Sequence, residues 1–117
     1  MKSASDTNIH IIGDASIAGD MPKSAFSANS QAKVAAMVVR NELIKTPAFP
    51  PRYTNTCWSL IETDNTVKVG GRYEPKDGKI TATETFVSKT GETADLRKAT
   101  QVENMGWYEG ITADMFS

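Results

Sequence analysis

The sequence has little of what several classes of protein require. With one cysteine and one histidine among 117 residues, it can form no intrachain disulfide and offers no Ser-His-Asp candidate set. It contains no metal-ligand cluster, no Walker loop and no G-x-G-x-x-G fingerprint. No apolar run approaches the roughly 18 residues that cross a bilayer, and the polar start "MKSASDTN" has no signal-peptide core. The net charge of −1 gives no electrostatic case for binding nucleic acid or an anionic membrane.

The first part of the chain predicts a strand, a loop and a helix. The short apolar run at residues 9–12 ends at Gly13 and predicts a buried strand of the parallel type. Ser24 or Ser27 is a candidate N-cap for a helix that continues to about residue 45. The predicted buried stripe of this helix consists of Ala32, Ala35, Ala36, Val39 and Leu43.

The second part has the two-residue period of strands. After a proline-rich linker, alternation predicts strands at residues 53–62, 67–73 and 79–88, which form an antiparallel meander. A helix is predicted over residues 93–108, followed by one short turn. Its predicted face consists of Leu96, Ala99, Val102 and Gly106. The predicted fold class is therefore α+β.

The predicted strand at residues 9–12 has no parallel partner within the chain. Parallel strands are normally buried between helices in a larger α/β sheet. We therefore interpret residues 1–46 as the last strand and helix of such a domain, and residues 47–117 as a second domain.

Two segments near the predicted helix start could bind a ligand. Gly13 lets a chain turn sharply at a strand end, and the Asp14 carboxylate could accept from sugar or ribityl hydroxyls. A tight turn capped by an aspartate is the alternative. Lys23, just before a helix N-terminus, suits an anion such as a reduced flavin, with an ordinary solvated lysine as the alternative.

The remaining candidate residues lie in the second part. Cys57 sits in the middle of a predicted strand and is either a packed cysteine or a redox thiol beside Trp58. Trp107 and Tyr108 are either core or interface residues or cofactor contacts. His10 is interpreted as a strand histidine.

Three stretches together carry a family resemblance. They are "IHIIGDASIAGDMPKSAFSANSQAKVAA", "YTNTCWSLI" and "WYEGITADMF", and they run from about residue 8 to the end of the chain. They resemble the C-terminal part of the flavoprotein subunit of flavocytochrome c sulfide dehydrogenase, a member of the flavoprotein disulfide-reductase class. Ala25 and Trp58 stand where the family pattern has glycine and tyrosine.

The resemblance implies an FAD site on a glutathione-reductase-like fold. It assigns FAD contacts to Gly13, Asp14 and Ala15 of the "GDA" motif, to Pro22, Lys23 and Ser24 of "MPKS", and to Trp107. It makes Cys57 one of a redox pair that sulfide attacks, with electrons passing to the flavin and then to a c-type cytochrome subunit that carries heme c. It also implies a periplasmic location.

The second redox cysteine and the dinucleotide fingerprint are absent from these residues. We therefore expect the N-terminal FAD and pyridine-nucleotide-like domains to lie outside the chain, and the chain alone not to bind FAD tightly. Apolar surface on the helix near residues 27–45 predicts self-association. Two alternatives stay open. One is a non-catalytic α+β interface or dimerisation module. The other is a relative of sulfide:quinone reductase or NADH dehydrogenase, which the short, mixed tail disfavours.

Overall fold

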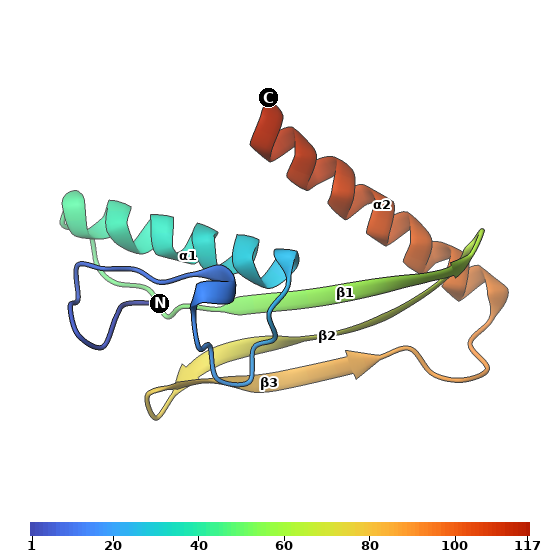
Figure 1. Cartoon of the computed structure of the whole chain (residues 1–117), viewed down its shortest axis with the longest axis horizontal. Helices are drawn as coiled ribbons and strands as arrows, with labels where there is room; N and C mark the ends of the chain where they lie inside the picture. Colours follow the sequence, from blue (N-terminus) through green and yellow to red (C-terminus); the bar gives the residue numbers. More distant parts are fainter. The chain divides into compact units, whose positions relative to one another are not determined.

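The computed structural model describes all residues, 1–117, and confirms the α+β class (Figure 1). Its elements are η1 (Gly13–Ala15), α1 (Ala25–Leu43), β1 (Tyr53–Glu62), β2 (Asn65–Lys76), β3 (Lys79–Val87) and α2 (Ala94–Phe116). The three strands form one antiparallel sheet in the order β1-β2-β3, as the meander prediction requires. No helix is both long enough and apolar enough to cross a membrane.

The chain divides into two compact units that share the sheet. Unit 1 comprises residues 1–56 and 70–85, and unit 2 comprises residues 57–69 and 86–117. The predicted domain boundary near residue 46 refers to a longer protein and stays a prediction.

The segment at residues 9–12 differs from its prediction. It forms a single antiparallel bridge between Lys2 and His10, supported by hydrogen bonds from Ser3 N–H to the Ile9 carbonyl and from Ile11 N–H to the Met1 carbonyl. Its isoleucines are exposed. The expectation of a buried, parallel strand is therefore wrong for this chain. The physical reason is that a strand is buried by its neighbours, and these 117 residues supply no parallel neighbour.

Helix α1 begins as predicted but packs with a different face. Ser24 is the N-cap, and its hydroxyl accepts from the Ser27 N–H at 3.0 Å. The buried residues of the helix are Ser27, Gln31 and Val34. Within the predicted apolar stripe, Ala36, Val39 and Leu43 are exposed, Leu43 to 77%, whereas Ala32 and Ala35 are half-buried. The prediction was wrong for these three residues, because α1 packs through Val34 in the core and through Ser27 and Gln31, whose hydrogen bonds an apolar pattern does not reveal.

Helix α2 is longer than predicted and also packs with a polar side. Its N-cap Thr93 accepts from the Leu96 N–H at 3.3 Å, and the helix continues past the predicted end at residue 108 to Phe116. The more buried residues are Arg97, Thr100, Gln101, Asn104, Trp107, Ile111 and Thr112. The predicted face is wrong, because Leu96, Ala99, Val102 and Gly106 are all exposed.

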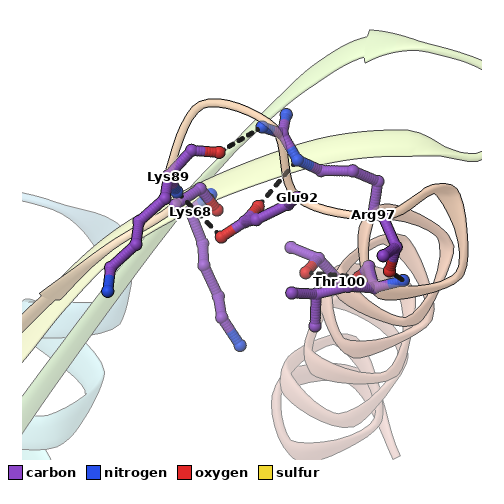
Figure 2. A network of polar contacts seen from close by, with 8 residues as sticks. Lys68, Lys89, Glu92, Arg97 and Thr100 are labelled. Carbon is purple, nitrogen blue, oxygen red and sulfur yellow. Dashed lines mark hydrogen bonds and ion pairs between the residues drawn. The ribbon is translucent and has the colours of Figure 1, made fainter.

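A polar network joins the start of α2 to the loop before it (Figure 2). The Glu92 carboxylate accepts from the Lys89 N–H at 2.8 Å and pairs with Arg97 Nε at 2.7 Å. The Arg97 guanidinium also donates to the Lys89 carbonyl at 2.9 Å. The Lys89 N–H, with help from the charge of Arg97, holds the pKa of the Glu92 carboxyl below its usual range.

We expect a Glu92→Gln variant to lower the unfolding midpoint at neutral pH by weakening this network. In the unfolded chain Glu92 titrates near its ordinary value of 4.5, whereas its folded pKa is lower. The ionised carboxylate therefore stabilises the fold above pH 4.5, and this contribution is lost as the pH falls through the folded pKa. Thermal unfolding from neutral pH to about pH 3 should show the two proteins converging.

Glu62→Gln is the matched control for this experiment. Glu62 is exposed in the same unit and accepts from the Asn65 side chain at 3.2 Å. An exposed contact of this kind contributes little to stability, so its loss should leave the midpoint nearly unchanged at every pH. If the unfolding midpoint of Glu92→Gln were as little changed as that of Glu62→Gln at every pH, the network would not have the stabilising role proposed for it.

Candidate functional site

A pocket lies in unit 1 where η1, the loop after it and the start of α1 meet. Its volume is about 130 Å³. Four of the residues predicted to contact a cofactor line it: Gly13, Pro22, Lys23 and Ser24. The structure therefore brings together two motifs, "GDA" and "MPKS", that are separated by five residues in the sequence. Asp14 and Ala15 belong to the same short helix, η1, and their side chains are exposed.

Gln31 organises the floor of this pocket, and sequence reasoning missed it. Its Oε1 accepts from the Gly13 N–H at 2.7 Å, and its Nε2 donates to Met21 Sδ at 3.4 Å. Gly13 has a positive φ of 64°, a backbone conformation that favours glycine. The Ser16 hydroxyl closes the same turn by donating to the Gly13 carbonyl at 2.8 Å. The only sequence signal was a polar residue inside an alanine-rich helix, and such a residue is normally predicted to face solvent.

The N-terminus of α1 is fixed by a buried polar cluster. Asn55 of β1 accepts from the Ser24 hydroxyl at 2.5 Å and from the Ser27 hydroxyl at 3.0 Å. Ser27 and Asn55 are both buried. This cluster holds the first turn of the helix against the strand, so the positive end of the helix dipole keeps a fixed place at the pocket.

The charges around the pocket favour an anion. The ammonium group of Lys23 donates to the backbone carbonyl of Asp14 at 2.6 Å, which holds the lysine beside η1. The first turn of α1 contains no acidic residue. Lys23 and the helix N-terminus therefore combine a full and a partial positive charge, the arrangement that suits a negatively charged group.

Cys57 and Trp107, the other predicted site residues, belong to unit 2. Cys57 is a half-buried cysteine in β1 that forms no disulfide within the chain. The ring of Trp107 packs against Trp58, with 5.8 Å between ring centroids and planes tilted by 33°. Neighbouring residues of a strand project to opposite faces, so Cys57 and Trp58 point to different sides of β1. The predicted redox role of Cys57 and the predicted flavin contact of Trp107 stay predictions.

A family model now adds to this geometry. Residues 49–116 match the family model of the flavin-binding domain of flavocytochrome c sulphide dehydrogenase. The chain belongs to this family. Flavocytochrome c sulphide dehydrogenases are oxidoreductases, and the name of the family implies a cytochrome partner. The match includes Cys57, Trp58 and Trp107, whereas the residues that line the pocket precede it. The pocket is connected to the matched region by the hydrogen bonds of Ser24 and Ser27 to Asn55.

The pocket is smaller than a complete cofactor site. Such sites typically enclose about 300–1,000 Å³, so a pocket of about 130 Å³ has room for only part of a flavin. Ile17 lines the pocket and is 99% exposed, so an apolar side chain is available to a flat ring. The turn at Gly13 and the cation at Lys23 supply the polar part of the wall.

Proposed function

We propose that this chain forms the C-terminal wall of the FAD site in a sulfide:cytochrome c oxidoreductase. The observation that carries the proposal is the pocket at the start of α1, where the predicted residues Gly13, Pro22, Lys23 and Ser24 converge beside a helix N-terminus. Membership of the flavocytochrome c sulphide dehydrogenase family supports flavin as the ligand. The rest of the FAD site and the pyridine-nucleotide-like domain come from outside these residues.

Lys23 and the first turn of α1 have an electrostatic role in this proposal. When bound, the flavin supplies an acceptor for the electron pair that sulfide gives up. Lys23 and the helix N-terminus lower the energy of negative charge at the pyrimidine end of the ring. The hydrogen bond from Lys23 to the Asp14 carbonyl keeps the cation near this position before the charge develops. Asp14 and Ala15 lie on the side where FAD hydroxyl and phosphate groups are expected.

Cys57 is the proposed site of sulfide chemistry. In the oxidised protein it forms a disulfide with a cysteine from outside this chain. Hydrosulfide attacks one sulfur, the S–S bond breaks, and a persulfide and a thiolate result. A second hydrosulfide releases the outer sulfur of the persulfide, which leaves two thiolates that can close the disulfide again. The electron pair given up in that closure would pass to FAD and then, one electron at a time, to a c-type cytochrome subunit that carries heme c. Trp107 is proposed to lie near the flavin ring, and the complex to act in the periplasm.

A Lys23→Met variant of the FAD-loaded protein tests the placement of the flavin. Removing a cation that faces the ring should cost the anionic reduced form about 1–2 kcal/mol, the energy of two unit charges roughly 8 Å apart at an effective dielectric constant near 20. For a two-electron couple this corresponds to a midpoint potential lower by roughly 20–40 mV. Spectroelectrochemical titration of the flavin measures the change.

Lys45→Met is the control for this titration. Lys45 follows the C-terminal end of α1, and the 19 residues of the helix place it roughly 28 Å away. The control removes the same charge and should leave the potential unchanged. Equal potentials in all three proteins would mean that Lys23 does not face the ring, and would favour a non-catalytic module.

A further inference from the structure

Helix α2 carries an exposed stripe with the spacing of a coiled coil. Its members recur at intervals of four and three residues, the heptad pattern of packed helix pairs. They are Lys98, Val102, Met105, Glu109, Thr112 and Phe116, hereafter the α2 stripe, and all of them are exposed except Thr112, which is half-buried. Val102 is 65% exposed, Met105 49% and Phe116 80%. The stripe lies away from the side that packs within unit 2, which includes the buried Thr100 and the Trp107 ring.

The charges in the stripe are complementary to a second copy of the same stripe. If two α2 helices pair in antiparallel fashion, Val102 of one faces Met105 of the other, and Lys98 faces Glu109. The two-fold axis repeats both contacts, which gives an apolar centre flanked by two ion pairs. A parallel pair would instead place Lys98 against Lys98 and Glu109 against Glu109. Gly106 and Ala113 flank the stripe, so the two helices can approach closely.

We propose that the α2 stripe is the interface of an antiparallel homodimer. The occupant is a second copy of this chain, and the Lys98–Glu109 pairs set the orientation and register. The intrachain partner of Lys98 is Asp64 at 3.1 Å, in an exposed pair that can be exchanged at small cost.

The exposed face of α1 does not have this complementarity. It presents Met37 and Leu43 together with Lys33 and Arg40, so a self-paired α1 brings like charges together. The one acid of α1, Glu42, already pairs with Lys2. The charge pattern therefore places self-association on α2 rather than on the α1 face that the sequence indicated.

Sedimentation equilibrium of the 117-residue chain tests the proposal. We expect the wild-type chain to dimerise. Met105→Glu should weaken the dimer by roughly 100-fold, because the charge enters the apolar centre twice. Met115→Glu is the matched control, since Met115 is exposed on the same helix but lies off the stripe. The dissociation constant of its dimer should equal that of the wild type. Circular dichroism confirms that both variants keep their helices.

A charge exchange tests the register. Glu109→Lys and Lys98→Glu should each weaken self-association, whereas a mixture of the two variants should form a heterodimer at least as tight as the wild type. The proposal is overturned if the wild-type chain is monomeric up to about 1 mM, which would leave a different protein as the occupant. It is also overturned if Leu43→Lys abolishes the dimer while Met105→Glu does not, which would move the interface to α1.

Discussion

A Gly19→Ala variant is expected to lose about 3 kcal/mol of stability in unit 1. Gly19 has a φ of +60°, and a Cβ built on it would lie 2.2 Å from the backbone carbonyl oxygen of Ile80. A residue other than glycine pays about 1–2 kcal/mol for the left-handed backbone alone. The clash adds to this cost, because its partner is a strand backbone and not a flexible side chain.

The contact at Gly19 secures a loop on the outer edge of β3. The Asp20 N–H donates to the Ile80 carbonyl at 2.9 Å, and the Asp20 carboxylate accepts from the Ala82 N–H at 3.1 Å. These two bonds cover part of a sheet edge that would otherwise be open to another strand. The same loop continues into the pocket wall, so a displaced loop would also disturb the candidate flavin site.

Gly78→Ala separates the clash from the backbone strain. Gly78 also has a positive φ, of 76°, but a Cβ there would meet nothing within 4 Å. Its replacement should cost only the backbone term of about 1–2 kcal/mol. Urea unfolding compares the two variants, and amide exchange at Ala82 reports loss of the edge contact. A Gly19→Ala cost equal to that of Gly78→Ala would show that the loop can move aside freely.

The strands of this chain were readable from the sequence, and the packed faces of its helices were not. Alternation and turn residues predicted β1 at residues 53–62, where the structure has it, because both are local properties of the chain. The same reasoning chose apolar sides of α1 and α2 that are exposed at most of the predicted positions. Their packed sides are held by hydrogen bonds such as those of Gln31 and Arg97, whose partners lie far along the chain or in a neighbouring loop.

The candidate site also has one part that the sequence predicts and one part that it does not. Gly13, Pro22, Lys23 and Ser24 were identified from motifs, and the structure gathers them at one pocket. Gln31 was missed, because its role depends on a turn 18 residues away. Short motifs can identify residues that line a pocket, but the polar side chains that hold those residues in place leave no local pattern.

A Cys57→Ser variant of the FAD-loaded protein is expected to lose sulfide-dependent cytochrome reduction by at least about 10³-fold. Serine is close to cysteine in size, so β1 should keep its packing, but an alcohol cannot form the disulfide that sulfide attacks. Anaerobic assays with sulfide and a c-type cytochrome measure the loss. The flavin spectrum should persist, since the predicted FAD contacts lie at residues 13–24 and 107.

Ser59→Ala is the matched control for Cys57→Ser. Ser59 lies two residues further along β1, so its side chain projects to the same face of the strand as Cys57, and it is exposed. Its replacement should leave activity within about twofold of the wild type. A chemical reductant that delivers electrons directly to the flavin should still drive cytochrome reduction in Cys57→Ser, because only the sulfur step is removed. Near-normal sulfide-dependent reduction in Cys57→Ser would mean that sulfide is oxidised without this cysteine, and would overturn the redox assignment. The placement of the flavin at Lys23 is tested separately by the potential of Lys23→Met.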